Sequence, residues 1–153
     1  MGGYHGAICA PSRVILMNDK SLYHVYDKLD GVKTMPMHFA ESGYETFGTE
    51  KWHNKAPSFE ASFQYGKNVF IGGTADYFNR PVRDLQKNGK LRELVKKGYS
   101  SDLFADAAID CINGYAEREK DNPFFYYIVS SEPHDPCSPR CIVVVVLPAR
   151  SSW

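Results

Sequence analysis

The chain has 153 residues, enough for one domain with its own hydrophobic core. Hydrophobic residues make up 43% of it and charged residues 24%, as is usual for globular proteins. The 18 basic and 18 acidic residues balance, so no net charge draws the chain to nucleic acid or to a membrane surface. No signal peptide is visible at the start, and the longest apolar run, 142–147, is too short to span a bilayer. We therefore expect no nucleic-acid partner and no membrane partner.

The first half of the chain predicts two helices followed by short strands. Proline in the first turn and an apolar run behind it predict a helix over 11–17. Thr34 is a predicted N-cap for a helix that runs to residue 42, where Gly43 ends it. A short strand over 44–47 then runs into Gly48. Residues 54–68 are predicted to be mostly loop, and 69–71 a short strand closed by Gly72 and Gly73.

The second half contains the clearest helix and the clearest strand. Apolar residues repeat at the spacing of an amphipathic helix over 103–117, which we expect to be the longest helix. The basic stretch 87–97 is interpreted as a solvated helix face without function. Residues 124–129, FFYYIV, have the pattern of a strand that is buried on both faces. A helix followed by a strand occurs twice, which favours an α/β fold with a mainly parallel or mixed sheet flanked by helices.

The last residues differ in character from the rest. Residues 141–147 are strand-like but lack polar alternation, and 148–153 match no recognisable pattern. The segment is either a core strand whose partners are missing or the product of a reading-frame error, and we favour the second interpretation. We expect one partial domain over 1–140 and an atypical tail over 141–153 that is either frameshifted or disordered.

Polar clusters follow the predicted strands. Lys51-Trp52-His53 comes after the strand at 44–47, and Pro133-His134-Asp135-Pro136 comes after the strand at 124–129. Ligands of open α/β sheets bind beyond the carboxyl ends of the strands, so both clusters belong at one edge. Cys9, at the start of a predicted helix, could complete that edge, because a helix N-terminus attracts anions. With Arg13 nearby, the pattern predicts a site for an anion with several oxygens.

Each of these residues also has an ordinary structural interpretation. A lone cysteine such as Cys9 is by default a buried thiol. Lys51 could be a solvated lysine at a strand end, His53 a hydrogen-bonded loop histidine, and His134 part of a rigid turn between two prolines. Their shared position at one predicted edge favours a functional site.

Three motifs resemble those of the formylglycine-dependent (type I) sulfatases of the alkaline-phosphatase-like superfamily. Cys9-Ala10-Pro11-Ser12-Arg13 fits the signature Cys-x-Pro-Ser-Arg. Gly43-Tyr44-Glu45-Thr46 followed by Lys51-Trp52-His53-Asn54 is similar to the second motif, and Pro123-Phe124-Phe125 leading to Pro133-His134-Asp135-Pro136 resembles the third. The three stand in family order between residues 8 and 136.

The resemblance implies a role for each candidate residue in a sulfuric ester hydrolase of the arylsulfatase kind. A maturation enzyme would convert Cys9 to Cα-formylglycine, the nucleophile and one calcium ligand. Arg13 would hold the formylglycine. Lys51 would bind the sulfate oxygens, and His53 would take a proton from the diol. His134 would bind sulfate and assist the leaving oxygen, while Ca²⁺ would polarise the sulfate.

The sequence also departs from the family pattern. The paired aspartates that hold calcium are expected before residue 1, and the Asp-Asn pair and the second lysine beyond His134, where the atypical tail stands. Glu50 replaces the glycine that usually precedes the lysine, and Asn18-Asp19-Lys20 replaces Thr-Gly-Arg. We therefore expect a truncated or decayed copy that has little or no activity by itself.

The implied partners are a sulfated small molecule or carbohydrate and a formylglycine-generating or other sulfatase-maturing enzyme. The full-length family would be periplasmic or secreted, although this chain shows no such signal. The alternative is a non-catalytic sulfatase remnant that keeps the fold. A phosphatase or phosphodiesterase of the same superfamily is disfavoured, because those usually have Thr or Ser where Cys9 stands.

Overall fold

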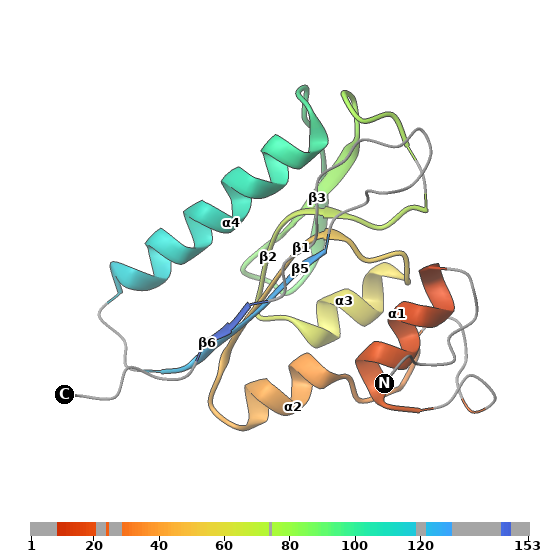
Figure 1. The fold of residues 1–153 in the computed structure, drawn as a ribbon, viewed down its shortest axis with the longest axis vertical. Helices are drawn as coiled ribbons and strands as arrows, with labels where there is room; N and C mark the ends of the chain where they lie inside the picture. Colours follow the sequence, from red (N-terminus) through yellow and green to blue (C-terminus); the bar gives the residue numbers. More distant parts are fainter. Residues whose placement is uncertain are drawn as a thin grey trace.

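The computed structural model describes residues 9–20, 24, 29–73, 75–118, 122–129 and 145–147. These residues form four helices and six strands (Figure 1). In chain order the elements are α1 (Cys9–Asn18), α2 (Met35–Glu41), β1 (Glu45–Lys51), α3 (Ala56–Ser62), β2 (Tyr65–Phe70), β3 (Pro81–Leu85), β4 (Leu91–Val95), α4 (Ser100–Ala116), β5 (Phe124–Val129) and β6 (Val145–Leu147).

The six strands form one mixed sheet in the order β4-β3-β2-β1-β5-β6. The central strand β1 is parallel to both of its neighbours, β2 and β5. The outer pairs, β2 with β3, β3 with β4 and β5 with β6, are antiparallel. The predicted α/β fold with a mixed sheet flanked by helices is therefore confirmed, with its parallel pairs at the centre.

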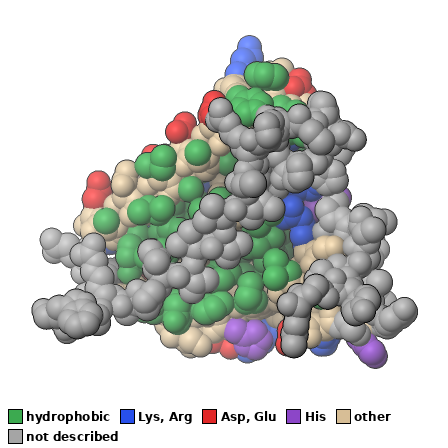
Figure 2. Space-filling view, viewed as in Figure 1, with side chains coloured by type: hydrophobic (Ala, Val, Ile, Leu, Met, Phe, Trp, Pro, Cys, Tyr) green, Lys and Arg blue, Asp and Glu red, His purple; other side chains and the backbone are tan. Residues whose placement is uncertain are grey.

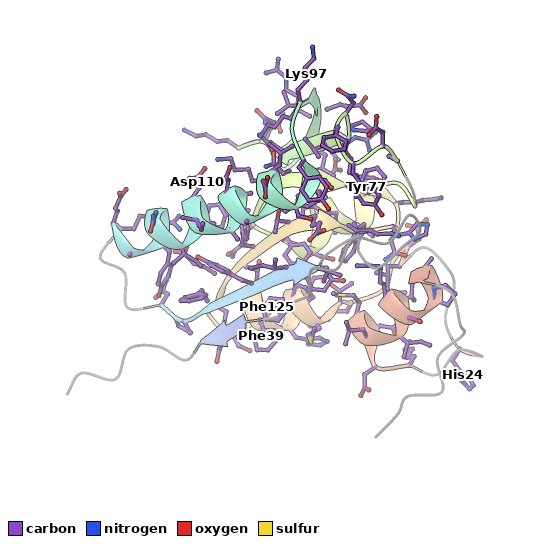
Figure 3. All side chains as sticks on the ribbon, turned by 45° about the horizontal axis from the view of Figure 1, so that its top comes forward. His24, Phe39, Tyr77, Lys97, Asp110 and Phe125 are labelled. Atoms are coloured by element: carbon purple, nitrogen blue, oxygen red, sulfur yellow. The ribbon has the colours of Figure 1, made fainter. Side chains whose placement is uncertain are left out.

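Helices cover both faces of the sheet. In Figure 1, α1, α2 and α3 lie on one side of the strands and α4 lies on the other. Strand β5 contributes side chains to the packing on both faces of the sheet, because successive side chains of a strand point to opposite faces. Phe125 and Tyr127 join the core beneath α1–α3, whereas Phe124 and Tyr126 pack with the side chains of α4. Phe39 of α2 stacks on Phe125 with ring centroids 4.6 Å apart (Figure 3).

Helix α4 is amphipathic as predicted, and it is the longest helix among the described residues. Phe104, Ala107 and Ala108 are buried. Figure 2 shows acidic side chains along the outer edge of α4 and apolar side chains toward the sheet. The helix therefore covers the sheet face with its buried residues and presents acidic side chains, together with Ile109 and Ile112, to solvent.

Strand β1 is longer than predicted, because Gly48 does not end it. A Cβ built on Gly48 would lie 2.7 Å from the Phe59 ring of α3, and one on Gly66 of β2 would lie 2.6 Å from the same ring. Gly48 and Gly66 are register partners in the sheet. The two glycines leave the space that Phe59 fills, so here glycine marks close packing within a strand.

The prediction of a mostly irregular segment over 54–68 is wrong. It contains α3 and most of β2. Helix α3 has only seven residues, and its start is marked by Pro57 in the first turn. Ser58, Phe59 and Ser62 form its buried face. Such a short helix shows little periodicity in the sequence, and packing against the sheet stabilises it.

The prediction of a helix face over 87–97 is also wrong. Strands β3 and β4 form an antiparallel hairpin, and Gly89 in its turn has φ +75°. Asn88-Gly89 is a strong hairpin signal, because glycine adopts this left-handed backbone without steric cost.

Part of the atypical tail joins the sheet. Leu147 pairs with Phe124 and Val145 with Tyr126, so β6 adds an antiparallel strand beside β5. The domain boundary at residue 140 stays a prediction.

Candidate active site

Three parallel strands end at one edge of the sheet, here called the carboxyl edge. Lys51, the last residue of β1, is the register partner of Phe70, the last residue of β2. Glu50 is the partner of Val129, the last residue of β5. The opposite edge, where β1 begins at Glu45, is called the amino edge.

Helix α1 is attached to the carboxyl edge through Arg13. Its Nη1 donates a hydrogen bond of 2.7 Å to the carbonyl oxygen of Lys51 and contacts the hydroxyl oxygen of Tyr127 at 3.2 Å. These partners are 38 and 114 residues away in the sequence. One guanidinium therefore joins α1 to the ends of β1 and β5, and α1 begins at Cys9.

Lys51 and Trp52 form the buried base of the edge, each only 1% exposed. The backbone N–H of Trp52 donates to the Phe70 carbonyl at 2.8 Å, and its indole Nε1 donates to Ser58 Oγ at 2.8 Å. The Trp52 ring also packs edge-on against Phe59. Trp52 therefore packs into the core and ties the turn between Lys51 and His53 to β2 and α3.

The backbone at this edge is strained. The register of β1 against β2 shifts between Thr49 and Glu50. Glu50 has φ +72° and His53 has φ +59°, both in the left-handed region that costs a non-glycine residue about 1–2 kcal/mol. Such residues persist only where surrounding contacts hold them. The bulge and these turns direct the side chains that leave β1.

The Tyr127 hydroxyl is a buried part of the same cluster. Burial raises the pKa of the Tyr127 phenol and the charge of Glu50 raises it further, while the Arg13 guanidinium partly opposes both. Glu50 is 3% exposed. The carboxyl edge thus gathers the part-buried Arg13 guanidinium with the buried side chains of Lys51, Glu50 and Tyr127 where the parallel strands end.

The structure joins Arg13 to Lys51 and places His53 two residues further along the same turn. Cys9 is the first residue of α1, and its side chain is not described. His134 lies outside the described residues. The catalytic roles of all five residues stay predictions.

No metal centre forms within the described part of the chain. There, no three His, Cys, Asp or Glu side chains are grouped so that they could hold an ion. Calcium requires six to eight oxygen ligands. The described residues alone therefore do not fit a calcium site.

Two contributors to the edge were not identified from the sequence. Tyr127 was interpreted only as part of a buried strand, although a buried tyrosine hydroxyl usually needs a hydrogen-bond partner. That requirement is the signal in the sequence that indicates a polar partner for Tyr127. Gly73 was interpreted only as the end of a strand, but a Cβ there would lie 2.7 Å from His53 Nε2. No local pattern in the sequence indicates that contact.

The fold and this edge define an α/β protein with buried cations where its parallel strands end. The sequence model of the sulfatase family, described as Sulfatase, matches residues 2–144. The chain belongs to the sulfatase family. This is a family of sulfate ester hydrolases whose members generally use Ca²⁺ and a formylglycine and act on sulfated substrates. Among the described residues, no helix combines the length and the apolar character needed to cross a bilayer.

Proposed function

We propose that this chain carries the nucleophile and anion-binding part of a sulfuric ester hydrolase. One observation supports this above all: Arg13 bonds to the Lys51 carbonyl at 2.7 Å. That bond attaches the helix that begins at Cys9 to the strand end that leads into His53. The nucleophile, the anion-binding cation and the base of the proposed reaction thus belong to segments in direct contact.

In this proposal Cys9 is oxidised to formylglycine by a maturing enzyme, and its hydrated aldehyde supplies the hydroxyl that attacks sulfur. Lys51 neutralises sulfate oxygens, and its burial strengthens that interaction because little water screens it. His53 holds and accepts a proton at the nucleophile. Arg13 fixes α1 against the sheet, and His134 assists the leaving oxygen.

Calcium remains part of the proposal through family membership. Because the described residues do not form a calcium site, we propose that its ligands, apart from modified Cys9, come from outside them. None of the steps above depends on the ion.

Glu50 supports a second candidate, a non-catalytic remnant. Its carboxylate is 3% exposed and directly precedes Lys51. A buried negative charge beside an anion site opposes sulfate binding, because nearby like charges repel strongly in a low dielectric. We therefore expect slow turnover, or none, from this chain alone.

The test starts with the chain co-expressed with a sulfatase-maturing enzyme, followed by intact-mass analysis of Cys9. The purified protein is then assayed on 4-nitrophenyl sulfate with excess Ca²⁺, beside Cys9→Ala as the matched control. Turnover that disappears in Cys9→Ala supports the hydrolase. Unmodified Cys9 with no turnover supports the remnant. Turnover that persists in Cys9→Ala would overturn the assignment of the nucleophile.

A further inference from the structure

Two consecutive glycines in the segment after β2 each face a ring. A Cβ built on Gly72 would lie 2.6 Å from Cζ of Phe70. A Cβ built on Gly73 would lie 2.7 Å from Nε2 and 3.1 Å from Cε1 of His53. Neither glycine has a backbone in the left-handed region, so φ does not explain why glycine is needed. The neighbouring rings explain it, because a Cβ on either glycine would lie too close to one of them.

The two contacts differ in what a substitution would displace. The Phe70 ring is 3% exposed and lies beneath the Arg80 guanidinium, 4.6 Å from the ring centroid. It cannot move without disturbing packed neighbours. His53 is only half-buried, so its ring has space toward solvent when an added methyl group displaces it. An added methyl group should therefore strain the fold at Gly72 and displace only the imidazole at Gly73.

The segment that carries Gly73 is held by contacts both before and after this glycine in the sequence. Trp52 donates its backbone N–H to Phe70, which fixes the end of β2 against the turn into His53. Further along, Arg80 is 2% exposed, stacks on Phe70 and Tyr77, and donates from Nη2 to the Ala75 carbonyl at 3.2 Å. Figure 3 shows Tyr77 in the connection after β2. Gly73 therefore presents a fixed surface to His53.

His53 is constrained from its own backbone as well. Its φ of +59° sets the direction in which the side chain leaves the turn. The recess at Gly73 then determines where the ring comes to lie. Strain in the backbone and a matching recess in a neighbouring segment together select one position for the imidazole.

We propose that Gly73 is a positioning residue for His53: the absence of a Cβ creates the recess that the imidazole occupies. The catalytic meaning of this contact rests on the proposed function, in which His53 handles the proton of the nucleophile. Displacing a positioned base misaligns proton transfer even when the fold is intact.

The test compares Gly73→Ala with Gly72→Ala, an identical change one residue away that faces Phe70. NMR spectra of the histidine rings are recorded for both variants and wild type, with the His53 signals assigned by their loss in His53→Gln. We expect Gly73→Ala to shift the His53 ring signals while its Tm stays within about 2 °C of wild type. We expect Gly72→Ala to lower Tm by roughly 3 °C or more and to leave the His53 signals in place.

The inference is overturned if the His53 signals of Gly73→Ala coincide with those of wild type, or if Gly72→Ala moves them equally. A titration of wild type with inorganic sulfate tests the proposed function separately. If sulfate leaves the His53 signals unmoved while Gly73→Ala still shifts them, the proposed function fails and the positioning contact stands.

Discussion

The two edges of the sheet handle buried charge in different ways, and two glutamates on β1 show it. Glu45, at the amino edge, is 8% exposed and pairs with Arg118 across 3.1 Å in ordinary strand backbone. Glu50, at the carboxyl edge, is 3% exposed with φ +72°. The same residue type on one strand is relaxed at one end and strained at the other.

Within the described part of the chain, one open hollow lies away from the strained backbone. A cavity of about 750 Å³ lies at the amino edge, lined by Tyr44, Glu45 and the β3–β4 turn among other residues. The carboxyl edge instead concentrates buried cations and left-handed backbone. Strain and desolvated charge are features of functional sites, whereas an open hollow is not enough to mark one. This cavity and the candidate site are at different edges of the sheet.

The largest expected effect comes from Arg80, which is buried and stacks on Phe70 at the end of β2. Arg80→Ala should destabilise the fold by about 3 kcal/mol, because it removes a desolvated cation–π stack and leaves a void. The matched change at the amino edge, Arg118→Ala, should cost about 1 kcal/mol, since its ion pair with Glu45 is partly solvated. Urea unfolding measures both, and equal losses would remove the contrast between the edges.

The second largest effect is expected on anion affinity, which should depend on the lysine of the carboxyl edge and not on that of the amino edge. Lys51→Met removes a buried cation and should weaken binding of inorganic sulfate about 10- to 100-fold, as expected for a charged hydrogen bond of about 1.5–3 kcal/mol. Lys87→Met, at the amino-edge cavity, should change it less than about twofold. NMR titration gives both dissociation constants. Similar losses in the two variants would show that binding is not localised at the carboxyl edge.

The same substitution should change the free energy of unfolding in opposite directions at the two glutamates of β1. Glu50→Gly should stabilise the fold by about 1 kcal/mol, because it relieves left-handed strain. Glu45→Gly should destabilise it by about 1 kcal/mol, through a lost ion pair and a glycine in extended backbone. Thermal unfolding of both variants provides the measurement. Destabilisation by Glu50→Gly would mean that the contacts of its side chain outweigh the strain.

The smallest expected effect is on the pH dependence of folding stability, through Glu60 at the amino edge. Burial alone raises the pKa of Glu60, but the Leu91 N–H and the Lys90 ammonium lower it, and the net pKa lies below the ordinary carboxyl value. A lowered folded-state pKa adds stability above the unfolded-state pKa, and that stability is lost as pH falls through the folded-state pKa.

Glu60→Gln should therefore be less stable than wild type by under about 1 kcal/mol at neutral pH. The difference should shrink as pH falls below the ordinary carboxyl range of about 4. Urea unfolding across this pH range measures it, and a difference that is constant with pH would contradict the role of the Glu60 charge.

Local patterns in the sequence are enough to predict the elements that carry them. The α/β class, the helices at α1, α2 and α4 and the strand β5 follow from apolar spacing, capping residues and a run buried on both faces. Motif order gave the family and placed Arg13, Lys51 and His53 among the candidates. These signals are local, because they depend on residues within one or two turns of each other.

Which distant residues share an environment depends instead on how the elements pack against each other. The hydroxyl of Tyr127 meets Arg13 across 114 residues, and Phe59 lies against glycines of two strands. Gly73 was interpreted as the end of a strand, but it faces the His53 ring. The physical reason is that a glycine in the sequence shows only that a Cβ is absent. What fills the space is set by packing between segments that the sequence does not place beside each other.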